Sequence, residues 1–245
     1  GLTATRAKGS AAPTVATRAS AKHVIKDDSS GNRQYVQVAP GWPSQNQMYS
    51  GGKLWRGYLG EAAATNLMGE SENFSLWTNY SSSDAVDGVS ILGRTRTKVS
   101  GDPGLSSIYK AWTAVDGVKY CAWCIYERDT DRYAAIFHDA NGNQRVVFDL
   151  DAPDGNPKVT SGTPDSYGAI ELGTGSGIWL LWVTKTAIGA GGKNFSIASS
   201  DQALEFSIGA GSFYIHHAQV EAGSLPSTPI YTSGESATRA ADDLR

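Results

Sequence analysis

The chain has 245 residues, a net charge of −3 and only two cysteines. This length can bury one large core or two modest ones, whereas two thiols cannot supply a disulfide framework. The acidic balance argues against non-specific nucleic-acid binding, and no apolar run reaches the ~18 residues that a membrane span requires. We therefore expect neither nucleic acid nor a membrane as a partner. Frequent glycine (28), tyrosine (11) and tryptophan (7) favour strands and turns over helices.

Residues 1–34 form a basic, low-complexity segment without any Phe, Trp or Tyr. Six basic and two acidic side chains make it positive, while the rest of the chain sums to −7. Such a composition cannot bury enough apolar surface to fold alone. It is either a disordered tail or an arm that becomes ordered against an acidic surface of a larger assembly. Its basic residues are Arg6, Lys8, Arg18, Lys22, Lys26 and Arg33.

Residues 35–58 differ from this arm because aromatic side chains stand among glycines and prolines. The alternation at Tyr35–Val38 predicts a short strand, and the following Pro-Gly-Trp-Pro sequence ends it. We expect a connecting segment that packs its aromatic rings on a neighbouring surface.

Residues 59–245 contain one predicted strand after another and no long amphipathic helix. The nearly continuous apolar runs at 118–127 and 178–184 indicate strands covered on both faces. Asn141-Gly142, between two such runs, predicts a hairpin whose two turn positions both accept a positive φ. The fold class predicted is all-β: a jelly-roll β-sandwich preceded by an extended, largely irregular N-terminal arm. The expected strands are 89–92, 118–127, 133–137, 145–150, 178–184, 195–198, 204–208 and 213–220.

Two groups of spaced residues bracket this domain. The first reads Gly60-Glu-Ala-Ala-Ala-Thr-Asn-Leu67 and continues with Ser71-Glu-Asn-Phe-Ser-Leu-Trp77. The second leaves a strand through two prolines that forbid a helix, and ends in a Thr-Arg-Ala-Ala-Asp tail. Its residues are Gln219, Glu221, Gly223, Pro226, Thr228, Ile230, Thr232, Thr238, Arg239, Ala240, Ala241 and Asp242.

Together these two signatures resemble the opening and closing segments of a jelly-roll domain of bacteriophage tail-fibre, spike and decoration proteins. The resemblance covers residues 59–242, about three quarters of the chain. Tyr231 departs from the pattern, because the family usually has a proline there. The resemblance implies a virion structural protein, usually a homotrimer, that is assembled in the bacterial cytoplasm and displayed on the particle surface.

The function implied is adhesive. The arm would anchor the protein to other virion proteins of the capsid or tail, while the jelly roll projects and contacts a host surface glycan. One alternative is a tail receptor-binding protein that recognises host polysaccharide. A further alternative is a polysaccharide-degrading enzyme.

Three short motifs resemble metal sites. Cys121 and Cys124 are three residues apart, so on a strand their sulfurs point to opposite faces, and we expect two buried free thiols. The neighbours His216 and His217 should likewise diverge, with one in the core and the other facing solvent or a subunit. The Asp-x-Asn-x-Asn run at 139–143 imitates a calcium loop, but its glycine is at the fourth position instead of the sixth. We expect no cofactor other than a weak structural calcium.

Glycoside hydrolysis needs two carboxyl groups facing each other across a cleft. Acidic residues are numerous enough near the strand ends, but such residues are usually just solvated. No hydrolase motif accompanies them, and we expect no enzymatic activity. The acidic residues concerned are Glu127, Asp129, Asp131, Asp149 and Asp151.

Aromatic side chains on or near the predicted strands are the remaining candidates for a binding site. An exposed ring on a sheet can stack on the apolar face of a sugar, although rings on strands more commonly fill a core or a subunit interface. Trp179 and Trp182 should point to opposite sides of their strand. The candidates for sugar stacking are Trp112, Tyr126, Tyr133 and Trp179.

Overall fold

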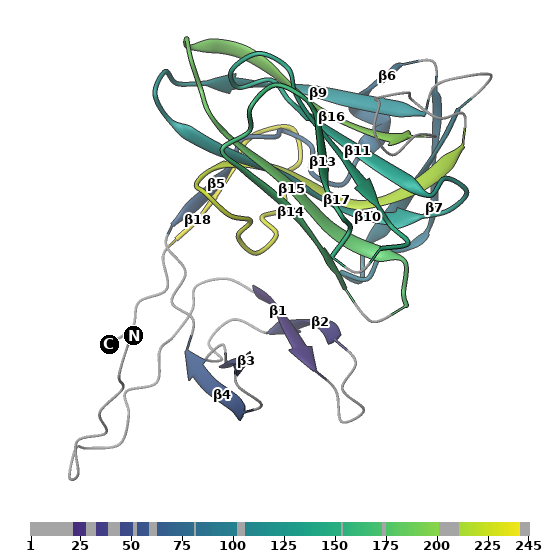
Figure 1. Cartoon of the computed structure of the whole chain (residues 1–245), viewed down its shortest axis with the longest axis vertical. Coiled ribbons are helices and arrows are strands. Elements are labelled where there is room, and N and C mark those ends of the chain that lie inside the picture. Colours follow the sequence, from purple (N-terminus) through teal and green to yellow (C-terminus); the bar gives the residue numbers. More distant parts are fainter. Residues whose placement is uncertain are drawn as a thin grey trace.

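The computed structural model describes residues 63–240, apart from 81, 102–105, 153, 173–174 and 201–210, and the backbone of four earlier strands (Figure 1). Strand β1 (Lys22–Asp27) pairs with β2 (Arg33–Val38), and β3 (Gln45–Ser50) pairs with β4 (Lys53–Tyr58), both antiparallel. The strand predicted at 35–38 lies within β2. The β1–β2 pairing crosses the predicted boundary at residue 34.

Two six-stranded sheets, in which every pair of neighbours is antiparallel, form a sandwich over the described residues. The first sheet has the order β14 (Ser166–Glu171), β15 (Ile178–Thr186), β10 (Lys119–Arg128), β17 (Ser212–Ala222), β8 (Thr95–Gly101) and β7 (Ser82–Val89). The second has the order β13 (Lys158–Ser161), β12 (Gln144–Asp149), β11 (Tyr133–His138), β16 (Gly191–Ser200), β9 (Ser107–Ala114) and β6 (Thr78–Tyr80). The predicted all-β sandwich is confirmed.

The core follows from the two-residue period of the strands. On β10, Ala122, Cys124 and Tyr126 face the other sheet and join the main buried cluster. Alternate residues of the same strand, Cys121 and Trp123 among them, belong to a second buried cluster on the outer face of the first sheet. The expectation that this strand is covered on both faces is confirmed.

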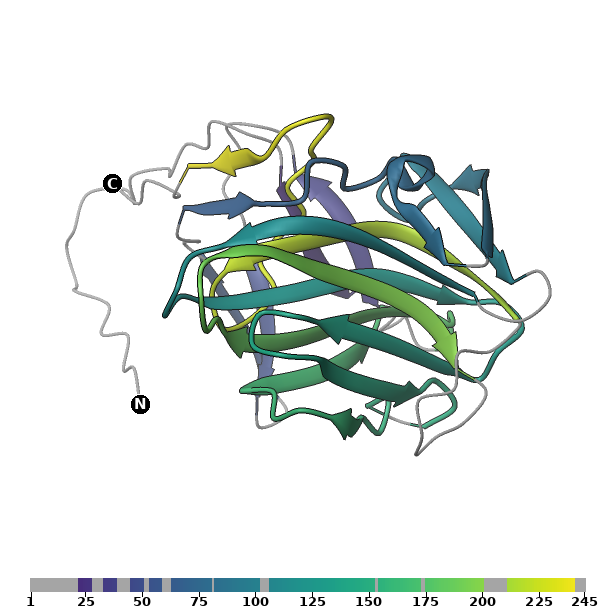
Figure 2. The ribbon, with the colours of Figure 1, turned by 90° about the horizontal axis from the view of Figure 1, so that it is seen from above.

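The outer face of the first sheet is covered in part by the segment after β17, which we call the strap (residues 223–236). The strap leads to β18 (Ala237–Arg239), which pairs with β5 (Ala64–Asn66). These two short strands lie side by side in both views (Figures 1 and 2). The hydroxyl groups of Thr65 and Thr238 share a hydrogen bond of 2.8 Å. The two sequence signatures that bracket the domain therefore meet in space.

Side chains of the closing signature hold the strap against the sheet. The Glu221 carboxylate accepts hydrogen bonds from the indole N–H of Trp123 (2.8 Å) and from the backbone N–H of Ser227 (2.7 Å). The Gln219 amide oxygen accepts one from the backbone N–H of Ile230 (2.8 Å), whose carbonyl accepts one from Asn66 (2.8 Å). The signature is thus a set of backbone and side-chain contacts that fixes the strap.

Three local expectations need correction or refinement. The strand predicted at 89–92 is wrong, because β7 ends at Val89 and Ser90 stabilises a turn that includes Gly93 at φ +74°. The hairpin predicted at Asn141-Gly142 is confirmed between β11 and β12, but only Gly142 has a positive φ. The predicted strand at 204–208 lies outside the described residues.

In the described part of the chain the only helical element is one 3₁₀ turn, η1 (Phe74–Leu76). No helix among these residues is long and apolar enough to span a membrane.

Candidate ligand-binding site

Three of the four rings predicted to stack on sugar lie in the main core. The exposed fractions are 4% for Trp112, 0% for Tyr126 and 3% for Trp179. Trp112 stacks on His138 (centroids 5.6 Å apart), and Tyr126 stacks on Phe213 (4.9 Å). A ring enclosed in this way has no face to offer to a sugar.

Tyr133 is the fourth candidate and is half-buried on the outer face of the second sheet. The guanidinium carbon of Arg132 lies 5.1 Å from the centre of its ring. The expected divergence of Trp179 and Trp182 is confirmed, since Trp182 packs against the outer cluster of the first sheet. The basic residues assigned to virion anchoring are all outside the residues whose side chains are described: Arg6, Lys8, Arg18, Lys22, Lys26 and Arg33.

The two thiols behave as expected of structural cysteines. Cys121 and Cys124 are free and buried, and they belong to clusters on opposite faces of the sheet. Burial raises the pKa of Cys121 to about 12 and also raises that of Cys124 well above its ordinary value. Both sulfurs are therefore protonated and inert at neutral pH.

The two adjacent histidines do not diverge, which corrects the prediction. A β-bulge between β10 and β17 makes Ile125 pair with His217 and Tyr126 pair with Ile215, so His216 is an extra residue. Both imidazoles consequently point to the outer side of the first sheet and are buried. The alternation rule fails here because the bulge inserts one residue.

His216 takes part in a charged cluster on that face. Its Nε2 lies 2.8 Å from Glu127, and its Nδ1 accepts a hydrogen bond from the backbone N–H of Ile91 (3.2 Å). Because Nδ1 accepts, Nε2 carries the proton and donates to Glu127. Burial alone would raise the pKa of Glu127, but hydrogen bonds from His216 and Arg96 outweigh it and lower that pKa. Glu127 is therefore ionised and held in place.

The other acidic residues considered for catalysis are also engaged. Asp129 pairs with Lys98 (2.8 Å), Asp149 with Arg132 (2.6 Å) and Asp151 with Arg128. Asp131 accepts a hydrogen bond from the backbone N–H of Gly211 (3.1 Å). These contacts explain the carboxylates as parts of ion pairs and turns. No group of three or more His, Cys, Asp or Glu side chains in the described residues is arranged to hold a metal ion.

A pocket of about 210 Å³ lies on the outer face of the second sheet. Strands β11, β12 and β16 run side by side there, and Phe137 is the register partner of both Arg145 and Ser196. Each strand, or the turn next to it, contributes two side chains. The lining residues are Phe137, Asp139, Asn143, Arg145, Asn194 and Ser196.

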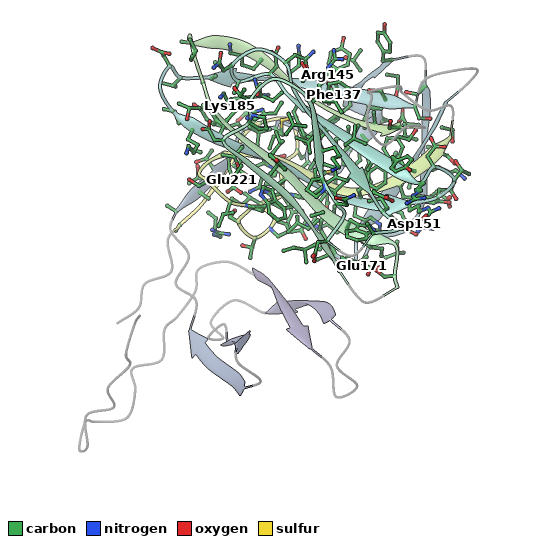
Figure 3. All side chains as sticks on the ribbon, viewed as in Figure 1. Phe137, Arg145, Asp151, Glu171, Lys185 and Glu221 are labelled. Atoms are coloured by element: carbon green, nitrogen blue, oxygen red, sulfur yellow. The ribbon has the colours of Figure 1, made fainter. Side chains whose placement is uncertain are left out.

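Phe137 and Arg145 form one wall of this pocket. The guanidinium carbon of Arg145 lies 5.2 Å from the centre of the Phe137 ring, and Figure 3 shows the two side chains next to each other. This distance is within the range of a cation–π contact. The wall therefore combines an apolar ring with a fixed positive charge.

The remaining wall is polar and anchored by the backbone. The backbone N–H of Asp139 donates to the carbonyl of Asn194 (3.1 Å), which fixes the turn after β11 against β16. Within the described part of the chain, the side chains of Asp139, Asn143, Asn194 and Ser196 make no hydrogen bond to another residue. Their donors and acceptors are thus available to a ligand.

Part of this site was identified from the sequence as a hairpin turn that imitates a calcium loop. The Asp-x-Asn-x-Asn run was recognised, and the hairpin it predicts does carry Asp139 and Asn143 into the pocket. Arg145, Asn194 and Ser196 were missed, because alternation on separate strands does not reveal which strands are neighbours. The polar residues that alternate with buried Phe195 and Ile197 on β16 were the signal available.

No protein-family profile and no curated protein matches the chain. Among solved structures, it is similar to the CBM22-1–GH10 modules of endo-1,4-β-D-xylanase 10B from Clostridium thermocellum, complexed with xylohexaose. The TM-score is 0.40 and the identity 12%, over 67% of this chain and 30% of that chain. It is also similar to the enzymatically active domain of tailspike protein 4 of bacteriophage CBA120. There the TM-score is 0.30 and the identity 16%, over 61% of this chain and 20% of that chain. Each match covers less than a third of the other chain.

Proposed function

We propose that this protein is a non-catalytic glycan-binding adhesin of a bacteriophage particle, and that the pocket between β11, β12 and β16 is its binding site. The observation that carries the proposal is the lining of the pocket. An apolar ring stands beside polar groups that both donate and accept hydrogen bonds, and polar groups placed in this way fix the orientation of a ligand. Sugars present an apolar ring face together with hydroxyl groups, so they match both parts of this lining.

Binding without catalysis is favoured by the carboxylate content of the pocket. Asp139 is the one carboxylate in its described lining, whereas glycoside hydrolases use a pair of carboxyl groups about 5–10 Å apart. The other acidic residues discussed above are tied to basic partners or to backbone groups. A hydrolase would need a second carboxyl group that faces Asp139.

The setting on a phage particle rests on the two sequence signatures. Capsid decoration or a fibre-like role is our first choice, with the N-terminal arm as the anchor and a homotrimer as the assembled form. Three copies in one trimer would support weak single-site binding through avidity. A tail receptor-binding protein is the second choice, and immunogold labelling of particles would separate the two by location.

The test is binding of the purified chain to host envelope polysaccharide, with released reducing ends assayed in the same sample. Saturable binding without release, weakened by Asn194→Ala or Arg145→Ala but not by Thr113→Ala, is the expected result. Thr113 is a matched control because it is exposed and belongs to β9 of the same sheet. Release of reducing ends would show an enzyme, and absence of binding would overturn the adhesive function.

A further inference from the structure

The volume of the pocket limits the size of its ligand. It measures about 210 Å³, below the ~300–1,000 Å³ of sites that enclose drug-sized molecules. Since one water occupies roughly 30 Å³ of liquid, the space corresponds to about seven waters. A single pyranose ring with its substituents fits such a space, and the rest of an oligosaccharide would lie outside it.

The outer face of this sheet also carries Tyr109, which is partly buried and is the register partner of Ser196 but does not line the pocket. Three of the predicted stacking rings are in the core, and Tyr133 is four residues from Phe137 along β11. That spacing separates the two residues by roughly 13 Å along the strand. Tyr133 is absent from the pocket lining and packs beside the small buried residues Ala135 and Val147. The polar groups that can hold a sugar are concentrated at the Phe137 end.

The charges of the pocket limit the chemistry of its ligand. An ionised Asp139 can only accept hydrogen bonds, and Arg145 can only donate them, while Asn143, Asn194 and Ser196 do both. An acidic sugar would meet like charge at Asp139 and opposite charge at Arg145, and an amino sugar the reverse, so in each case attraction and repulsion offset while the sugar's charge loses water. Hydroxyl groups donate and accept, so an uncharged polyol satisfies both ends of the site.

We infer that the pocket holds one uncharged sugar residue, at a chain end or on a side branch, and that the length of the attached glycan has little effect on affinity. This inference rests on the proposed function and names the part of the glycan that is recognised. With so few ligand atoms in contact, the dissociation constant of a single site is expected to be about millimolar.

The experiment measures competition against polysaccharide binding by small probes. They are the methyl glycosides of neutral hexoses, 6-deoxyhexoses and N-acetylhexosamines, with glucuronic acid and glucosamine as charged counterparts. We expect at least one neutral glycoside and an oligosaccharide that ends in the same sugar to have inhibition constants within about threefold of each other, expressed per sugar end. We expect its charged counterpart to be at least ~10-fold weaker, as a lost or opposed charged contact implies.

Variants locate the site and separate the possible outcomes. Asp139→Asn and Asn194→Ala should weaken binding of the competing neutral glycoside by about 10-fold or more, with thermal unfolding unchanged. Tyr133→Ala and Thr113→Ala should leave it unaffected. Affinity that rises steeply with chain length, is lost in Tyr109→Ala or Tyr133→Ala and is not competed by any monosaccharide would overturn this inference and leave the adhesive function intact. Absence of binding to every glycan would remove the proposed function itself.

Discussion

Glu72 and Arg94 form an ion pair, with Oε2 and Nη1 3.2 Å apart, yet the carboxyl group of Glu72 is hard to ionise. Burial raises its pKa from 4.5 to about 7, and the attraction of Arg94 only partly offsets this. Arg94 is half-exposed and also lies over the Tyr231 ring, 3.8 Å from its centre. The Oε1 atom of Glu72 has no hydrogen-bond partner among the described residues. The pair joins the segment after β5, the turn after β7 and the strap.

Removal of this carboxyl group should change the pH dependence of stability. Because the folded state holds the Glu72 proton more tightly than the unfolded state, its contribution is full below about pH 4.5 and is lost as the pH rises through about 7. The free energy of unfolding of Glu72→Gln, relative to that of the wild type, should therefore rise by about 1–3 kcal/mol between pH 4.5 and 8. Urea unfolding at several pH values measures this, with the exposed Glu235→Gln as control. Parallel pH profiles for Glu72→Gln and the wild type would contradict the prediction.

His138 should act in the opposite direction. Burial lowers its pKa from 6.5 to about 4, although the ring is within hydrogen-bond distance of the Tyr120 carbonyl (Nε2–O 3.2 Å). The folded state thus resists protonation, and stability should be lost as the pH falls from about 6.5 through about 4. In His138→Gln this loss, at most about 3 kcal/mol, should be absent whatever the stability of the variant at pH 7. An unchanged loss on acidification would show that another group is responsible.

Glu221 should be critical for the strap. Replacement by alanine leaves the indole N–H of Trp123 and the backbone N–H of Ser227 without their acceptor in a buried place. We expect a loss of about 2–4 kcal/mol in the free energy of unfolding, together with faster proteolysis within residues 223–236. Glu221→Gln keeps one acceptor oxygen and should lose less. Glu235→Ala on the exposed part of the strap is the control, and equal losses for both alanine variants would refute the clamp.

Two strand glycines, Gly168 in the first sheet and Gly192 in the second, allow a matched test of packing. A Cβ on Gly168 would lie 2.3 Å from Cζ2 of Trp182, whereas a Cβ on Gly192 meets nothing within 4 Å. Gly168→Ala must displace the indole and should destabilise the protein by about 1–3 kcal/mol with a change in tryptophan fluorescence. Gly192→Ala should be neutral or slightly stabilising, because it restricts the unfolded chain. Similar effects of both substitutions would argue against close packing of Trp182.

Strands with strong patterns were predictable because the pattern itself reports burial. The unbroken apolar runs at 118–127 and 178–184 correspond to β10 and β15, which pair with each other in the first sheet. The opposite directions of Cys121 and Cys124 follow from the two-residue period and are found. Weaker strands such as β8 and β13, which carry many polar residues, gave no comparable signal.

The binding site was less predictable because it depends on long-range pairing. Asp139 and Asn194 are 55 positions apart and become neighbours only when β11 pairs with β16. A strand covered on both faces also hides which side a ring occupies, so Trp179 could not be assigned to the core in advance. Trp112 lies on β9, which was not among the predicted strands. The bulge at His216 is a further example, since nothing local in the sequence marks the extra residue.

The pairing of β5 with β18 has a consequence for protein engineering. Ala64 and Arg239 are register partners, so their Cα atoms are about 5 Å apart, and the chain enters and leaves the sandwich at adjacent points. A segment whose two ends are this close can be spliced into a surface loop of an unrelated protein without forcing that loop apart. Residues 63–240 are therefore suited to transplantation as a cassette, with the pocket carried intact into the recipient.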